Sequence, residues 1–276
     1  MRKLALLAAS IVLVLLITDA WGASLPRGEP DAVGLSGERL ERIGRVLRGE
    51  IEKGKIPGAV ALVARKGRIA YFESFGVRDP ATGAPMTKDA IFRIYSMTKP
   101  VTSVAVMMLQ EEGRLVLSDP ISKFLPQLTN LKVAVERKDG AGFDLVPVAR
   151  EITIQDLLRH TSGFAYGSRT RNALVKERYA KEGVDSRDLT NAELVDRLAR
   201  VPLAHQPGAS WEYSRSTDVL GRLVEVIAGV PLGRFFEERI FAPLKMTDSA
   251  FTSPRPSWVA WRSRSPSIRR RATRSR

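Results

Sequence analysis

Cysteine is absent from the 276-residue sequence, and histidine occurs only at His160 and His205. Without cysteine the chain can form no disulfide bond, and it has no thiol to carry a lipid anchor. Zinc sites are built mainly from cysteine, histidine and carboxylate ligands, so a conventional metal site is not expected here. We predict that the protein needs no metal or other cofactor and is held together by hydrophobic burial.

Several common enzyme signatures are also absent from the sequence. It contains neither a Walker motif nor a glycine pattern of the dinucleotide-binding kind, and no Gly-x-Ser-x-Gly elbow of α/β-hydrolases. A Ser-His-Asp triad would have to recruit His160 or His205. Each of these is better interpreted as a hydrogen-bonded structural histidine, because neither is accompanied by a second catalytic signal.

The N-terminus carries the pattern of a secretory signal. Arg2 and Lys3 precede an uncharged apolar run over residues 4–17, which is short for a bilayer span but fits a signal peptide. Small residues stand before a cleavage point near Ala23. We predict a signal peptide at 1–22 and a periplasmic or secreted protein. The alternative is an uncleaved N-terminal anchor, the only membrane contact that we expect.

The net charge of +14 is concentrated at one end of the chain. Residues 254–276 contain eight arginines and no acidic residue, which leaves +6 for the remainder. The domain at 23–253 is therefore not expected to bind nucleic acid. Two explanations of the tail stay open: a disordered Arg/Ser/Pro-rich segment that binds an acidic surface, or a shifted reading frame near Thr252.

Hydrophobic periodicity predicts a helix over 36–54, with Ser36 as its N-cap. Two strands joined at Lys66-Gly67 follow and predict an antiparallel hairpin. The next helix, from Ser96 to Gly113, is apolar nearly all round and should be buried at the centre of the molecule.

Shorter elements are expected in the second half of the sequence. Residues 120–150 and 164–188 look irregular, Thr153 is a candidate cap of a short helix, and a capping-box pattern opens another helix at Thr190. A further helix ends at Gly229. The predicted fold class is α+β or α/β, with an antiparallel sheet flanked by helices and a helical subdomain.

Ser96 and Lys99 stand one helical turn apart and are followed by Pro100. Proline is tolerated in the first turn of a helix, so the helix should begin within a residue or two of Pro100. A serine hydroxyl becomes nucleophilic when a base takes its proton, and a lysine amine can be that base if burial and the helix end lower its pKa. A capping serine beside a surface lysine is an equally good interpretation of this motif alone.

Other segments add to this motif. Tyr213 and Ser214 follow a Pro-Gly turn and precede a helix in "HQPGASWEYSRSTDVLGRLVEVIAG". Together with "FRIYSMTKPVTS", "LLRHTSG" and "IFAPLKMTDSAF", this segment resembles the serine β-lactamase and penicillin-binding-protein superfamily. The resemblance is strongest to its class C β-lactamase-like branch, which includes esterases with the same Ser-Lys-Tyr arrangement, and covers roughly residues 35–251. It implies a β-lactamase/transpeptidase-like fold.

The resemblance also implies roles for four residues. Ser96 would be the nucleophile that becomes acylated, and Lys99 would assist its activation. Tyr213 would be the second general acid/base, relaying a proton to the leaving group or activating the deacylating water. Arg215 occupies a substrate-binding position where the lactamase branch has asparagine, and this difference favours an ester over a β-lactam.

The third motif of the superfamily has no counterpart after Phe251, and with it a later strand and one oxyanion-hole N–H would be missing. Loss of one such donor costs on the order of 3 kcal/mol in barrier. We therefore expect an acyl-enzyme serine hydrolase acting on a small ester, amide or β-lactam, impaired by the missing strands. A non-catalytic penicillin- or peptidoglycan-binding protein and a basic interaction protein are the alternatives.

Overall fold

The computed structural model of the chain describes residues 25–251. The predicted signal peptide and the arginine-rich tail lie outside the described residues. Two compact units follow one another along the chain, residues 25–92 and residues 93–251, and each is described by itself. No helix within residues 25–251 is both long enough and apolar enough to cross a bilayer.

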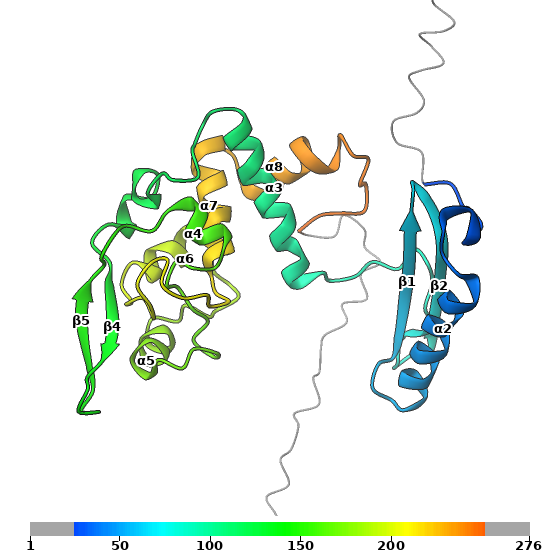
Figure 1. Cartoon of the computed structure of the whole chain (residues 1–276), viewed down its shortest axis with the longest axis horizontal. Coiled ribbons are helices and arrows are strands. Elements are labelled where there is room, and N and C mark those ends of the chain that lie inside the picture. Colours follow the sequence, from blue (N-terminus) through cyan, green and yellow to red (C-terminus); the bar gives the residue numbers. More distant parts are fainter. Residues whose placement is uncertain (1–24, 252–276) are drawn as a thin grey trace, which may run out of the picture. The chain divides into compact units, whose positions relative to one another are not determined.

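The first unit is an antiparallel sheet of strand order β1-β2-β3 with a helix packed along it (Figure 1). Leu40 of the helix packs against Tyr71 and Phe75 of the central strand and forms a small core. The elements are η1 (Asp31–Val33), α2 (Gly37–Glu52), β1 (Gly58–Arg65), β2 (Arg68–Asp79) and β3 (Ala84–Pro85).

Local sequence signals explain this unit. The Ser36 hydroxyl accepts a hydrogen bond from the Arg39 N–H and caps α2, as predicted. Lys66 and Gly67 both have positive φ, 51° and 67°, which matches the type I′ turns favoured in tight hairpins. The predicted helix and hairpin are therefore confirmed.

The second unit is mainly helical and contains one hairpin, β4–β5. Its elements are η2 (Tyr95–Met97), α3 (Thr98–Glu111), η3 (Ile121–Lys123), η4 (Pro126–Leu128), β4 (Lys132–Glu136), β5 (Phe143–Pro147), α4 (Ile154–Leu158), α5 (Ala173–Lys181), α6 (Asn191–Leu198), α7 (Ser216–Ala228), α8 (Leu232–Phe236) and a π-helical turn η5 (Glu237–Phe241). Helix α7 contacts α3, α4, α6 and α8 and is the centre of this unit.

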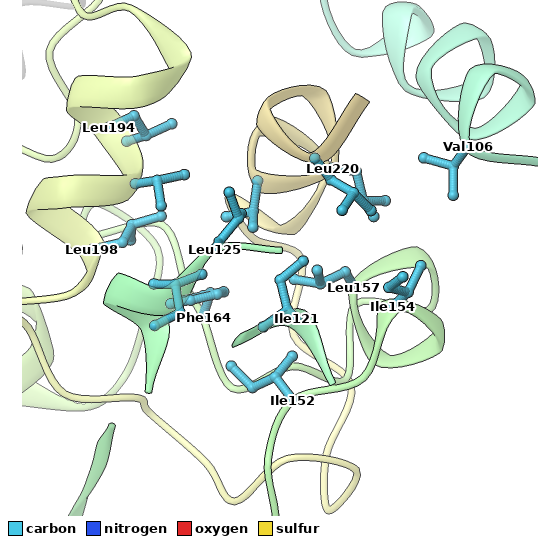
Figure 2. Close-up of a cluster of buried hydrophobic side chains, with 14 of the residues drawn as sticks. Val106, Ile121, Leu125, Ile152, Ile154, Leu157, Phe164, Leu194, Leu198 and Leu220 are labelled. Carbon is cyan, nitrogen blue, oxygen red and sulfur yellow. The ribbon is translucent and has the colours of Figure 1, made fainter. Parts of the chain in front are cut away.

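The core of the second unit surrounds α7. Leu220 of α7 is fully buried and lies among side chains from several other elements, including Leu125 and Leu157 (Figure 2). Full burial of one such leucine contributes about 2 kcal/mol relative to exposure. The core therefore fixes the start of α7, which directly follows the segment that carries Tyr213.

Helix α3 differs from its prediction. One face is buried through Ala105, Val106 and Leu109, but Val104 and Met107 are 49% and 41% exposed. The helix packs against α7 along a single face, so an apolar sequence all round does not produce burial all round. The expectation that this helix is buried at the centre of the molecule therefore holds for one of its faces and not for the other.

Two segments predicted to be irregular contain regular structure. The range 120–150 holds the antiparallel β4–β5 hairpin, in which Lys132 pairs with Pro147, and the range 164–188 holds α5. Asn172 caps α5 by accepting a hydrogen bond from the Val175 N–H. These short elements gain their stability from packing against the unit's core rather than from long periodic patterns.

The remaining signals are confirmed. Thr153 and Thr190 both open helices with complete capping boxes, and Gly229 ends α7 in the left-handed conformation. The predicted class, an antiparallel sheet flanked by a helix and accompanied by a helical subdomain, is also confirmed. No strand follows β5 within the range 25–251.

Candidate active site

Ser96 lies in a 3-10 turn that leads directly into α3. Pro100 occupies the first turn of this helix, where its missing N–H breaks no hydrogen bond. Tyr95, immediately before Ser96, has a φ of 42°, which is uncommon for a non-glycine residue and frequent at functional sites. The Lys99 ammonium donates a hydrogen bond to Ser96 Oγ at 3.2 Å, so the spacing in the sequence does bring the two groups together.

Tyr213 reaches the same hydroxyl from a distant part of the chain. Its Oη donates to Ser96 Oγ at 2.6 Å, and Lys99 Nζ lies 4.7 Å from the centre of its ring. The three predicted residues thus form one cluster within the second unit. Ser96 Oγ stands between a cation and a phenol, which is the arrangement needed to remove and return a proton.

The segment that carries Tyr213 is held by backbone hydrogen bonds. The Leu203 N–H donates to the Lys132 carbonyl, and the Ala204 N–H donates to the Gly163 carbonyl, both at 2.8 Å. Gly163 has a φ of 89°, and a Cβ atom there would lie 2.3 Å from a backbone oxygen, so only glycine fits. This packing explains why a loop residue can be placed accurately.

The charge state of Lys99 differs from the sequence-based expectation. Burial alone lowers the pKa of its amine, but a hydrogen bond with Tyr213 and the influence of Tyr166 outweigh burial and raise the pKa above its usual 10.5. The condition under which Lys99 could act as the base, a lowered pKa, is therefore not met. An ammonium group at this position can stabilise negative charge but cannot accept a proton from Ser96.

Tyr213 shows the opposite shift. Burial alone raises the pKa of its hydroxyl, but its hydrogen bonds with Lys99 and Ser96, together with the charges of Lys99 and Arg169, bring the net pKa below its usual 10.0. Arg169 places its guanidinium carbon 5.8 Å from the ring centre. Tyr213 is therefore the group of this cluster that is best suited to accept the serine proton.

Tyr166 belongs to the same cluster, although the motifs did not identify it. Its ring centre lies 5.5 Å from that of Tyr213 and 6.0 Å from Lys99 Nζ. Burial raises the pKa of its phenol, so it remains protonated beside the pair. The sequence did offer one signal, because Tyr166 lies three residues after Gly163, the end of a family motif. An aromatic residue in a segment predicted to be a loop, however, more often indicates packing than function.

Arg215, predicted to bind substrate, lies beside the cluster in a network of its own. Its guanidinium pairs with Asp185 at 3.1 Å and Asp218 at 3.6 Å, and its carbon lies 4.8 Å from the ring centre of Tyr166. The side chain is only 16% exposed. These contacts hold Arg215 against Tyr166, and its role toward a substrate stays a prediction.

Both histidines are hydrogen-bonded within the fold, as predicted. His160 Nδ1 lies 3.2 Å from Ser214 Oγ, and His205 Nε2 lies 2.7 Å from Glu212 Oε2. Neither nitrogen is directed at Ser96 by these bonds. The geometry therefore favours the Ser-Lys-Tyr cluster over a Ser-His-Asp triad.

Relatives of this chain carry names that bear on the cluster. The chain is 39% identical over 206 residues to Protein Rv1367c of Mycobacterium tuberculosis, a match over 74% of this chain and 50% of that protein. It is 36% identical over 234 residues to Esterase EstB of Burkholderia gladioli, a match over 84% of this chain and 57% of the esterase. The chain spans about half the length of these curated relatives.

The fold has close counterparts among solved structures. EstCE1, described as a hydrolase with promiscuous acyltransferase activity, superposes with a TM-score of 0.64 at 32% identity, over 75% of this chain and 52% of EstCE1. The profile of the Beta-lactamase family matches residues 43–274. This match covers most of the sequence and agrees with the motifs and the fold, so the chain belongs to the Beta-lactamase family.

Proposed function

We propose that the chain carries the acylation site of a serine hydrolase that cleaves an ester or amide through an acyl-enzyme on Ser96. The observation that carries the proposal is the contact of Ser96 Oγ with Tyr213 Oη at 2.6 Å and with Lys99 Nζ at 3.2 Å. An O–H···O⁻ bond is typically 2.5–2.7 Å long, so the shorter contact suits proton transfer between serine and phenolate.

Acylation then follows from the charges of the cluster. The Ser96 oxygen attacks the substrate carbonyl carbon while its proton passes to the Tyr213 phenolate, and the Lys99 ammonium stabilises the phenolate beforehand. The bond from the carbonyl carbon to the leaving oxygen or nitrogen breaks next. Tyr213 returns the proton to that leaving group, which leaves Ser96 esterified and Tyr213 ionised again.

Deacylation uses the same groups in reverse. Water, or an acceptor alcohol, gives its proton to Tyr213 and attacks the Ser96 ester, and the serine oxygen leaves with that proton. The name of Esterase EstB supports ester chemistry, and the description of EstCE1 as a hydrolase with promiscuous acyltransferase activity supports transfer to an acceptor other than water. We propose an ester as the preferred substrate, because the superfamily's amide-binding asparagine is replaced by Arg215.

Labelling with a fluorophosphonate tests this function. The full chain should form a covalent adduct that peptide mass mapping places on Ser96, and Ser96→Ala should form none. Thr98→Ala, which changes a neighbouring hydroxyl outside the cluster, is the matched control and should still be labelled. A folded wild-type protein without an adduct on Ser96 rules the proposal out.

A labelled penicillin and a chromogenic ester then separate turnover from trapping. We expect a burst of ester cleavage followed by steady turnover. An adduct on Ser96 that persists would instead favour the non-catalytic penicillin-binding alternative. If an oxyanion donor is lacking, both the burst and the turnover should be slow, because such a donor stabilises the tetrahedral intermediates of acylation and deacylation and changes rates by ~100- to 1,000-fold.

We also propose that the protein acts outside the cytoplasm, in the periplasm or the medium. The support is the basic and apolar pattern of residues 1–22. N-terminal sequencing of the exported protein should find Ala23 as its first residue. Full-length precursor in the membrane fraction would favour the uncleaved anchor, and precursor in the cytoplasm would overturn export.

A further inference from the structure

His160 occupies an unusual backbone position next to the cluster. It lies two residues after the end of α4, beyond the C-cap Arg159, and has a φ of 57°, in the left-handed region that non-glycine residues seldom adopt. Its ring centre lies 5.0 Å from that of Tyr213. A strained residue persists only where surrounding contacts hold it, and such strain is frequent near functional sites.

The contacts of His160 fall on the two residues that flank Tyr213. The Glu212 N–H donates to the His160 carbonyl oxygen at 2.9 Å. The Ser214 N–H donates to His160 Nδ1 at 3.3 Å. One residue therefore holds the backbone both before and after Tyr213, which fixes where the phenol can point.

The second contact requires a specific form of the ring. Nδ1 can accept the Ser214 N–H only when it carries no proton, so the neutral ring must carry its proton on Nε2. Burial and the positive charge of Lys99 lower the pKa of His160 and favour this neutral form. Tyr213, which is also titratable, faces the ring with 5.0 Å between the ring centres.

Buried hydroxyls support the same arrangement. Ser214 Oγ lies 2.7 Å from Ser216 Oγ, which in turn lies 2.7 Å from Ser162 Oγ, and all three serines are fully buried. The Ser216 N–H donates to Ser214 Oγ. These hydrogen-bonded serines connect the residue after Tyr213 to the start of α7 and to the segment that carries His160.

We propose that His160 is a positioning residue for Tyr213: its backbone oxygen and Nδ1 clamp the peptide on both sides of the phenol and hold it against Ser96. The inference rests on the proposed function of Ser96. His160 takes no proton in this role, and its effect on the reaction passes through Tyr213.

Two substitutions of His160 distinguish the effect of losing the Nδ1 acceptor from the effect of the positive φ. His160→Asn keeps an acceptor oxygen near the position of Nδ1 and tolerates positive φ, whereas His160→Gly tolerates positive φ but offers no acceptor. The second-order rate of Ser96 labelling should fall about 10- to 100-fold in His160→Gly and only a few-fold in His160→Asn, because small displacements of reacting groups have effects of this size.

A double-mutant cycle tests whether the effect passes through Tyr213. In the Tyr213→Phe background, His160→Gly should cause little further loss, since the group being positioned is already gone. The same fold loss in both backgrounds would show that His160 acts independently and would overturn the inference. If wild type is not labelled on Ser96, the proposed function fails first; if wild type is labelled and His160→Gly is labelled equally fast, only the clamp fails.

A measurement that leaves His160 itself unchanged complements these variants. Nitrogen-15 NMR of the histidine rings distinguishes the two neutral tautomers, and the signal that is lost in His205→Gln belongs to His205, which assigns the other signal in the wild-type spectrum to His160. We expect an unprotonated Nδ1 and a protonated Nε2 at pH 7. A protonated Nδ1 would exclude the bond from Ser214 and contradict the clamp.

Discussion

The charges of Lys99 and Tyr213 depend on each other, because each stabilises the ionised form of the other. The phenols raise the pKa of Lys99 despite its burial, and the hydrogen bond and charge of Lys99 lower that of Tyr213 despite its burial. Two groups coupled in this way titrate as a pair. These shifts favour an ammonium on Lys99 beside a Tyr213 hydroxyl that ionises more readily than that of free tyrosine. The Ser-x-x-Lys motif alone instead suggests a neutral amine that accepts the serine proton.

Substitution of Lys99 distinguishes these two mechanisms. Lys99→Met removes the ammonium, so the pKa of Tyr213 should rise and Ser96 labelling at pH 7 should slow by ~100-fold. Lys99→Arg keeps the charge but cannot act as a neutral base. We expect Lys99→Arg to be labelled faster than Lys99→Met, because the retained positive charge keeps the pKa of Tyr213 lowered.

The pH dependence of Ser96 labelling gives a second test of which group accepts the serine proton. Labelling should become faster as pH rises through the lowered pKa of Tyr213, and this limb should move to higher pH in Lys99→Met. Equal inactivity of Lys99→Arg and Lys99→Met, with an unshifted limb, would restore the neutral amine as the base.

At the scale of single elements, α4 determines where His160 lies. Asp156 in its first turn accepts hydrogen bonds from the Arg150 guanidinium at 2.6 and 2.9 Å and from the hydroxyls of Thr153 and Thr161. Its carboxylate is almost fully buried. Thr161 directly follows His160, so this ion pair fixes the turn from which His160 contacts the flanks of Tyr213.

Asp156→Asn should lower the free energy of unfolding at pH 7 by about 2 kcal/mol, judged from the pKa shift of the carboxyl. Burial alone would raise that pKa, but Arg150 and Thr153 bring it down to about 2. Below pH 3.8 the unfolded carboxyl binds more protons than the folded one. The contribution is therefore complete above pH 3.8 and is lost as pH falls toward 2, which urea unfolding at several pH values can measure.

Asp144→Asn is the matched control for this measurement. Asp144 pairs with Arg137 on the surface of the β4–β5 hairpin, and its side chain is 55% exposed. Exposed pairs of this kind contribute ~0–1 kcal/mol. Equal urea midpoints for Asp156→Asn and Asp144→Asn would mean that the buried pair adds no more stability than the exposed one and would contradict the prediction.

Elements with local end signals were predictable from the sequence. Ser36, Thr153, Thr190 and Gly229 mark helix ends through their own side chains or backbone conformations, and each prediction holds. The β4–β5 hairpin was not found, because its strands have only five residues each and depend on tertiary contacts.

Part of the candidate site was likewise predictable from the sequence, and part was not. Spacing placed Ser96 beside Lys99, and the family motif added Tyr213. The direction of the Lys99 pKa shift could not be predicted, because it depends on two phenols that arrive from elsewhere in the chain. The contacts of His160 were also hidden, since a single histidine carries no sign that its carbonyl and ring will meet the two neighbours of one tyrosine.

At the scale of the whole molecule, chemistry and charge lie in different segments. Ser96, Lys99 and Tyr213 all belong to the unit at 93–251, whereas eight of the arginines lie in residues 254–276. The reaction proposed for residues 93–251 therefore makes no use of the arginines in residues 254–276. Binding to anionic surfaces and acylation should be separable by deletion.

Deletion of residues 254–276 lowers the net charge from +14 to +6. We expect the shortened chain to elute from a heparin column at clearly lower salt, because each cation lost from a polyanion contact reduces the salt dependence of binding. The rate of Ser96 labelling should be unchanged. Unchanged elution would place the polyanion contacts in the remainder of the chain, and slower labelling would show that the tail supports the acylation site. If labelling is retained and heparin binding is weakened, the tail alone binds polyanions. The folded unit then carries out acylation without the tail.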